Sequence, residues 1–486
     1  MNSAENNRGE IRIIPYGGNG GLITGSCNVL EIRDNKIVVD CGLFQGRDEY
    51  LDRNGVPRNL NNISEVCRNT SDVLLTHVHM DHAGRLPMFV RNGFTPRMWA
   101  SEGTIKFLED MYDDSIKIQK RAKKPEEIMY DKDDVFQTLK QIKTVRPFEE
   151  IPIGHKNSRI SFEMIPNGHM YGSDSILIRD RHRNGGKNIL FTGDMGREHQ
   201  FVSGGWIDLI SEFPKDPIHI IVAESTSFDK EPTPIMESVN GLGDAINETF
   251  SKNGSVLLPT ISHRGPVLIE TVNYLKRKKS IPDNCRVYID GPLLYKIYMT
   301  YVKGIDPNEL TRNFGDIVDY YQTIEEAIAR FDLKDTKVIN SHQESVALSE
   351  RLAQSGERAI VIAGGGMGVG RAINYIRGPF SQNPNNSIIF TCYQVPGTLG
   401  AELIDKQDSN VLMKSKIYHF KGFTGHVSGE EETFAPLERY NLEKLETVMI
   451  GHGKDTSRKP MAKAFTIRTN EYVGVITPRI GQVITV

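Results

Sequence analysis

The chain has 486 residues, of which 38% are hydrophobic and 25% charged, and its formal net charge is −3. This composition is typical of a soluble globular protein with two or three domains, and it excludes a strongly basic nucleic-acid-binding protein, though not a local basic groove. No apolar run reaches the roughly 18 residues that a membrane helix needs, and the polar start MNSAENNRGE is unlike a signal peptide. The five scattered cysteines form no CxxC pair, so we expect reduced thiols and a cytoplasmic protein.

The first third of the chain predicts short strands and tight turns. RIIPYGG, NVLEI and KIVVDCG are β-branched runs that Gly, Asn and Asp interrupt. Helical patterns follow at 104–122 and 133–145, and strands return at 159–180 and 187–196. Beyond residue 215, apolar strands such as HIIVAEST and GSVLLPT alternate with helical segments, which indicates a parallel sheet with crossover helices. The end of the chain returns to short strands, and the expected joints between domains lie near 210–217 and 404–416.

One short segment carries the strongest chemical signal. The stretch LLTHVHMDHAGRLP contains His77, His79, Asp81 and His82 directly after an apolar run. Imidazole and carboxylate groups are ligands of divalent transition metals, and a site for two ions needs six to eight of them. Side chains at alternating positions let the first two histidines face one ion while Asp81 and His82 face a second. A metal site therefore accounts for this cluster better than four unrelated core or surface residues would.

One loop cannot complete the shells of two ions, so further ligands must come from elsewhere. Four candidates each end a predicted strand and lie beside a glycine or in a glycine-rich turn: Asp40 in IVVDCG, His169 in PNGHMYGS, Asp194 in FTGDMG and His452 in MIGHGKD. Residues in such positions are exposed at the rim of a sheet, where sites are built. Strand-end Asp is also common in ordinary turns, so each candidate is weaker alone than all four together.

Taken in order, these residues resemble the metallo-β-lactamase superfamily, and within it the β-CASP ribonucleases. AESTSFD, with Glu224, is similar to the family's motif A; GFTGHVSGEE, with His426, to motif B; and GHGKD, with His452, to motif C. The resemblance spans about residues 11–486 and includes relatives of the pre-mRNA 3′-end processing endonuclease. It implies an α/β fold, namely a metallo-β-lactamase αββα sandwich with an inserted β-CASP α/β domain. The expected boundaries are 1–216 and 411–486 for the first domain and 217–410 for the insertion.

The resemblance also assigns roles to these positions. It implies that His77, His79 and His169 bind one Zn2+, that Asp81, His82 and His452 bind the other, and that Asp194 bridges the two. Asp40 would orient the cluster through hydrogen bonds. His426 would protonate the leaving oxygen and Glu224 would hold a histidine, so the catalytic set is Asp81, Asp194, Glu224 and His426. The implied reaction is hydrolysis of single-stranded RNA, endonucleolytic in mode, by hydroxide that two zinc ions activate.

The sequence departs from the family pattern at several positions. Arg264 takes the place of a family arginine, but Pro266 and Val267 stand where Gln and Glu are usual. In AGGGMGVGR, Gly365 stands where the family has serine, and the amides of Gly365 and Gly366 are expected to cradle a backbone phosphate. Lys454 replaces the usual glutamate after motif C. These changes remove no expected ligand, but they leave the substrate preference open.

Several alternatives stay open at this level. A catalytically silent β-CASP scaffold, a 5′-exonuclease, a DNA nuclease and a small-molecule hydrolase are each compatible with part of the pattern. A histidine in motif C favours RNA over DNA, because DNA-processing members carry an apolar residue there. Single-stranded RNA is the expected partner, a membrane is not expected, and the family's frequent dimers raise the expectation of a homodimer.

Overall fold

The computed structural model describes residues 10–49, 56–60, 63–122, 124–182, 185–200, 205–304, 336–405 and 413–486. It divides into two compact units, the first made of residues 1–231 and 425–486 and the second of residues 232–424. The boundaries expected from the sequence, 216/217 and 410/411, stay a prediction, and the second lies outside the described residues. No helix in the described ranges is both long and apolar enough to cross a membrane.

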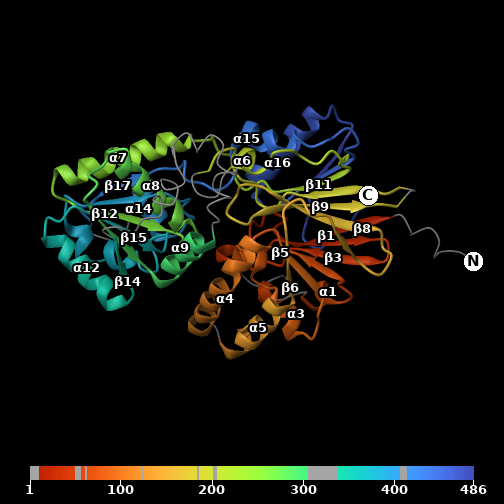
Figure 1. The fold of residues 1–486 in the computed structure, drawn as a ribbon, viewed down its shortest axis with the longest axis horizontal. Helices are drawn as coiled ribbons and strands as arrows, with labels where there is room; N and C mark the ends of the chain where they lie inside the picture. The colour runs from red at the N-terminus through yellow and green to blue at the C-terminus, as the bar shows by residue number, and fades with distance from the viewer. Residues whose placement is uncertain are drawn as a thin grey trace, which may run out of the picture. The chain divides into compact units, whose positions relative to one another are not determined.

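The first unit contains two seven-stranded sheets that face each other (Figure 1). One sheet has the order β20-β1-β2-β3-β4-β5-β6 and the other the order β19-β18-β11-β10-β9-β8-β7. The strands of the first sheet are β1 (Ile11–Gly17), β2 (Cys27–Ile32), β3 (Asn35–Val39), β4 (Asp72–Leu74), β5 (Arg97–Ser101), β6 (Ile142–Val145) and β20 (Ile484–Thr485). The strands of the second are β7 (Ile151–Ile153), β8 (Ile160–Pro166), β9 (Asp174–Asp180), β10 (Asn188–Phe191), β11 (Ile220–Ala223), β18 (Thr447–Ile450) and β19 (Gly474–Ile476).

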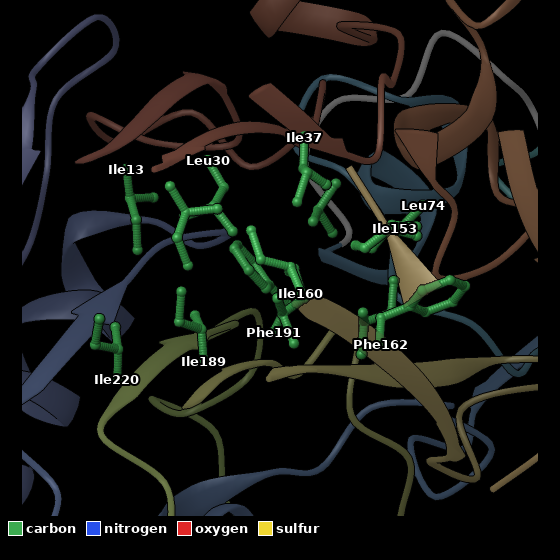
Figure 2. Packing of buried hydrophobic residues seen from close by; sticks show 14 of the residues in the cluster. Ile13, Leu30, Ile37, Leu74, Ile153, Ile160, Phe162, Ile189, Phe191 and Ile220 are labelled. Carbon is green, nitrogen blue, oxygen red and sulfur yellow. The ribbon is translucent and has the colours of Figure 1, made fainter. Parts of the chain in front are cut away.

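Buried aliphatic and aromatic side chains from the two sheets interdigitate to form the core of this unit (Figure 2). Ile13 and Leu30 come from the first sheet, and Phe162, Ile189 and Phe191 come from the second; each is at most 2% exposed. Burial of this kind stabilises a fold by roughly 25 cal/mol per Å² of apolar surface removed from water. The two sheets are therefore held rigidly, and their strand ends can present side chains at fixed positions.

Helices cover the outer faces of these sheets (Figure 1). The helix α4 contacts β5 and β6, and α16 contacts β18 and β19, which completes the predicted αββα sandwich. The helices of this unit are α1 (Ile63–Cys67), α2 (Met80–Ala83), α3 (Pro87–Arg91), α4 (Glu102–Ala122), α5 (Lys132–Gln141), α6 (Trp206–Leu209), α15 (Gly429–Leu437) and α16 (Asp455–Arg468), with 3₁₀ turns η1 (Gly46–Glu49), η2 (Arg58–Leu60) and η3 (Pro125–Glu127).

The second unit is built on one six-stranded sheet with the order β14-β13-β15-β12-β16-β17, in which every described pair is parallel. Its strands are β12 (Val256–Thr260), β13 (Arg286–Asp290), β14 (Thr336–Ile339), β15 (Ala359–Gly364), β16 (Ser387–Phe390) and β17 (Lys416–His419). Its helices are α7 (Ile235–Ser251), α8 (Gly265–Arg277), α9 (Pro292–Gly304), α12 (His342–Gln354), α13 (Ile373–Ile376) and α14 (Leu399–Asp405), with η4 (Ser262–Arg264) and η6 (Pro379–Gln382). The predicted alternation of strands and crossover helices is thus present.

Two strands close to the expected boundaries are assigned to a unit by their pairing. The strand β11 pairs with β10 and β18 inside the first unit. The strand β17 pairs with β16 inside the second unit. Backbone pairing, rather than any local feature of the sequence, decides to which sheet each strand belongs.

Candidate metal centre

The histidine-rich segment connects a buried strand to a short helix. The strand β4 ends at Leu74, and the chain then passes through Thr76, His77 and His79 before α2 begins at Met80. The His77 side chain is fully buried, and His82, inside α2, is 1% exposed. The loop and the first helical turn therefore direct neighbouring side chains to different sides of one small volume.

Three histidines and one aspartate form the first half of the candidate centre. The Nδ1 atom of His79 lies 2.9 Å from His77 Nε2 and 3.2 Å from His169 Nε2. Asp194 Oδ2 is 3.6 Å from the first of these Nε2 atoms and 3.7 Å from the second. Ligand atoms about 2.0–2.2 Å from a tetrahedral ion lie roughly 3.3–3.6 Å from one another. This group of four has the spacing of such a shell.

The second half is formed by Asp81, His82 and His452. The two Nε2 atoms of these histidines lie 3.0 Å apart, and His452 Nε2 is 3.7 Å from Asp81 Oδ2. Asp194 takes part here through its other oxygen, because Oδ1 lies 3.2 Å from His82 Nε2. One carboxylate thus presents one oxygen to each half, as a bridging ligand does.

Among the described residues, the Asp194 carboxylate has an oxygen with an unsatisfied hydrogen-bonding capacity, which fits a metal ligand. Asp194 is 2% exposed, and its Oδ1 accepts no hydrogen bond from the described part of the chain. An unsatisfied buried acceptor is costly, whereas coordination of a cation would satisfy it. The donor set of imidazole nitrogens and carboxylate oxygens is the one that zinc and similar divalent ions prefer. The residues therefore fit a pair of divalent metal ions.

The electrostatics of the two halves differ. Burial, together with the neighbouring imidazoles, lowers the pKa of His77 far below its ordinary value, and burial lowers the pKa of His79 to about 4. At His82 burial acts in the same direction, but the carboxylates of Asp194 and Asp40 outweigh it and raise the pKa. Burial opposes the charge of Asp194 as well, yet the surrounding histidines hold the pKa of this carboxyl well below its usual range.

Asp40 contacts a histidine of the second half, and the orienting role that the resemblance implies for it stays a prediction. It follows β3 with a left-handed φ of 61°, and its Oδ2 lies 2.7 Å from His82 Nδ1. Its Oδ1 accepts hydrogen bonds from the backbone amide and hydroxyl of Thr76 at 2.9 and 3.0 Å. Thr76 Oγ1 also lies 3.0 Å from His77 Nδ1. No feature of the sequence singled out Thr76.

Glu224 and His426 form a hydrogen-bonded pair beside the bridge. Glu224 directly follows β11, and its Oε1 lies 3.0 Å from His426 Nδ1 and accepts a hydrogen bond from Met195 N at 2.9 Å. His426 Nε2 lies 3.7 Å from Asp194 Oδ2, and this imidazole is 20% exposed, more than its carboxylate neighbours. Burial opposes the charged imidazolium, but the two carboxylates outweigh it, so the pKa of His426 is raised. The ring is thus suited to donate a proton from its accessible side.

The residues expected to contact phosphate lie in the second unit, and two of them already donate hydrogen bonds to carbonyl groups of the chain. Arg264 donates from Nη2 to the carbonyl of Phe423. The amide of Gly365 already donates to the carbonyl of Thr260 at 2.8 Å. With φ at +113°, a Cβ at Gly365 would lie 1.8 Å from Val369 O, so this conformation has no room for a serine. The phosphate-binding role of Arg264, Gly365 and Gly366 stays a prediction.

The other departures from the family pattern lie at helix starts. Pro266 and Val267 are buried in the first turn of α8. Lys454 occupies the residue immediately before α16. Neither place contributes a ligand atom to the two groups described above.

Comparisons with known proteins agree with this geometry. Residues 20–233 match the model of the metallo-beta-lactamase superfamily. Residues 267–403 match the Beta-Casp domain, so most of the chain is similar to a metallo-β-lactamase domain with a β-CASP insertion.

Named relatives and a solved structure extend over most of the chain. The "Ribonuclease TTHA0252" of Thermus thermophilus is 25% identical over 97% of this chain and 99% of its own length. The "Endoribonuclease ysh1" of Aspergillus fumigatus is 23% identical over 82% of this chain and 44% of its own length. A crystal structure of a protein of unknown function from Enterococcus faecalis V583 covers 98% of this chain and 100% of its own, with a TM-score of 0.57 and 14% identity. This last similarity concerns the fold alone.

Proposed function

We propose that this protein is a zinc-dependent ribonuclease that hydrolyses internal phosphodiester bonds of single-stranded RNA. The single observation that carries the proposal is the bridging position of Asp194, which presents one oxygen to each of two histidine clusters. The names of the relatives, a ribonuclease and an endoribonuclease, support RNA as the substrate and internal cleavage as the mode. A cytoplasmic location and a homodimer stay predictions.

The proposed mechanism uses the protein's own residues for orientation and proton transfer. Two bound divalent ions would lower the pKa of water and neutralise charge on the phosphate. His426 donates a proton from Nε2 to the leaving oxygen, and Glu224 holds its Nδ1–H and favours the charged ring. Asp81 completes the second half of the centre, where its carboxylate lies 3.7 Å from His452 Nε2 and its charge would offset that of a bound cation. Zinc is proposed because three of the four ligands in the first half are imidazoles.

The decisive experiment uses a covalently closed circular RNA, which only an endonuclease can open. Purified protein is incubated with circular RNA, with a 5′-labelled linear RNA and with DNA of the same sequence, and the zinc content of each preparation is measured. The variants are His77→Ala, His426→Ala and, as a control, His155→Ala, because His155 is exposed and lies outside both ligand groups.

We expect the wild-type protein to carry about two zinc ions and to open the circle. His77→Ala should lose zinc and activity, His426→Ala should lose activity alone, and the control should keep both. Cleavage restricted to the labelled 5′ end of linear RNA would replace the proposal by an exonuclease. Zinc without cleavage of any strand would favour a scaffold subunit, and preferential cleavage of DNA would overturn the choice of substrate.

A further inference from the structure

The outward nitrogen of a metal-binding histidine usually has a hydrogen-bonding partner, which fixes the tautomer of the ring. In the candidate centre, Asp40 provides this partner for His82 at 2.7 Å, and the carbonyl of Gly425 provides it for His169 at 3.2 Å. For His452 the group closest to Nδ1 is the hydroxyl of Thr226, whose Oγ1 lies 3.0 Å away. Neither the motifs nor the predicted ligand set assigned a role to Thr226.

The second contact of this hydroxyl determines the direction of the hydrogen bonds. Thr226 Oγ1 also lies 3.0 Å from the carbonyl oxygen of His452, which can only accept a hydrogen bond. The single hydroxyl proton therefore goes to the carbonyl, and the oxygen lone pair faces Nδ1. That nitrogen must then carry the hydrogen, which leaves the lone pair of Nε2 directed at His82 and Asp81.

The same contacts support an unusual backbone. His452 has a left-handed φ of 44°, a conformation that costs free energy in a residue with a side chain. Its carbonyl accepts from Ser225 N at 3.2 Å in addition to the Thr226 hydroxyl, and its amide donates to the carbonyl of Gly18. Ser225 Oγ donates to the carbonyl of Gly451, so it holds the preceding residue but does not contact the ring.

We propose that Thr226 is a positioning residue for the second metal ion. It holds His452 as the Nδ1–H tautomer and so makes Nε2 the ligand atom. Its backbone amide donates to Glu224 Oε2 at 2.7 Å, so one residue links the proton-donating pair to the second half of the centre. The inference rests on the proposed metal centre and does not depend on RNA being the substrate.

The test compares three variants of the full-length protein. Thr226→Val removes the hydroxyl and keeps the shape of the side chain, whereas Thr226→Ser keeps the hydroxyl. Ser225→Ala removes the neighbouring hydroxyl, which bonds only to backbone. Metal-free protein is titrated with Zn2+ in competition with a chromophoric chelator, so that the two binding steps are resolved. The tautomer of His452 is read from ¹⁵N spectra of histidine-labelled protein, with His452→Ala used for assignment.

We expect Thr226→Val to weaken the second binding step about 10- to 100-fold and to leave the first unchanged. The Nδ1–H signal of His452 should be lost in this variant only, and Thr226→Ser and Ser225→Ala should behave as wild type. Wild-type affinity in Thr226→Val, or equal weakening of both steps together with a lower unfolding temperature, would overturn the inference. A Thr226→Ser variant as weak as Thr226→Val would also overturn it. Since the readout is zinc binding, a failure to cleave RNA would count against the proposed function alone.

Discussion

The two halves of the metal centre are assembled in different ways. In the first half, His77 and His79 come from one short loop, and the neutral Thr76 hydroxyl lies beside His77 Nδ1. In the second half, His82 meets a histidine 370 residues further along the chain, and the Asp40 carboxylate holds its ring. The pKa values of His77 and His79 in the first half are lowered, chiefly by burial, whereas those of His82 and His452 in the second half are raised by carboxylates.

This difference shows what each half requires of the fold. The first half takes two of its four residues, His77 and His79, from one loop, and the other two follow β8 and β10 of the second sheet. The second half joins Asp81 and His82, from the segment after β4 of the first sheet, to His452, which follows β18 of the second sheet. Asp194 belongs to both halves, so its removal tests whether the two halves act as one site.

The largest effect is expected for Asp194→Asn. The amide keeps the shape but removes the charge that both halves share, so neither ion should be held in place. Metal ions stabilise the transition state by several kcal/mol, so their loss should lower the rate of cleavage at least about 10⁴-fold. Zinc content and cleavage rate are measured on the same preparation. A variant that keeps two ions and full activity would show that the halves do not depend on the bridge.

A smaller effect is expected for Glu224→Gln, which alters the proton donor and leaves both metal halves in place. The glutamine can still accept from Met195 N, but it no longer stabilises the charged ring of His426. Cleavage should fall about 10²-fold, within the range typical of general acid–base catalysis, while zinc stays at two ions per chain. Loss of zinc in this variant would instead make Glu224 part of the metal shell, to which its distance from Asp194 and His452 also corresponds.

Asp40→Asn should affect the binding of the two metal ions unequally. Its carboxylate contacts His82 directly, so the second ion should bind about 10- to 100-fold more weakly while the first is retained. The two steps are measured by chelator competition on metal-free protein. Equal weakening of both steps would mean that the link from Asp40 through Thr76 to His77 matters as much as its contact with the second half.

The two halves of the centre also show how much of the site could be predicted from the sequence. The residues that the structure brings together in the two halves were all predicted from the sequence, because each is a histidine or aspartate in a distinctive motif or beside a strand-end glycine; their role as metal ligands stays a prediction. Thr76 and Thr226 were missed because a threonine near a strand end is ordinary, and only the distance to a ring nitrogen reveals its part. The fold class followed from strand–helix alternation and the family motifs, and the family comparisons confirm it.

Other features depend on tertiary structure that no local pattern encodes. The strands β11 and β17 are each only four residues long, and their pairing partners assign them to a sheet. Similarly, the glycine-rich loop suggested free amides for a phosphate, yet the Gly365 amide is taken by Thr260. A sequence shows which groups a loop contains but not which of them already form hydrogen bonds within the folded chain.

The smallest effect on cleavage, and a clear effect on stability, is expected for Asp174→Asn. This residue begins β9, and its amide donates to the carbonyl of Thr76, so it holds the backbone directly before His77 of the first half. Its side chain is buried, and Oδ2 has no hydrogen-bonding partner among the described residues. Burial raises the pKa of Asp174 to about 7, although a hydrogen bond with Ser101 acts in the opposite direction.

The sign of the pH dependence follows from this shift. In the unfolded chain the carboxyl titrates near 4, so between about pH 4 and 7 the folded protein holds a proton that the unfolded chain has released. The free energy of unfolding therefore decreases as the pH rises through this window, by at most roughly 4 kcal/mol in all. Asparagine cannot ionise, so the variant should gain stability over wild type at pH 8 and show little difference at pH 4.5. Denaturant unfolding at both pH values measures this, with Asp34→Asn, at an exposed position, as the control. A difference between Asp174→Asn and wild type that stays constant with pH would mean that Asp174 is ionised in the folded protein, and that the first half of the centre is supported by a buried charge.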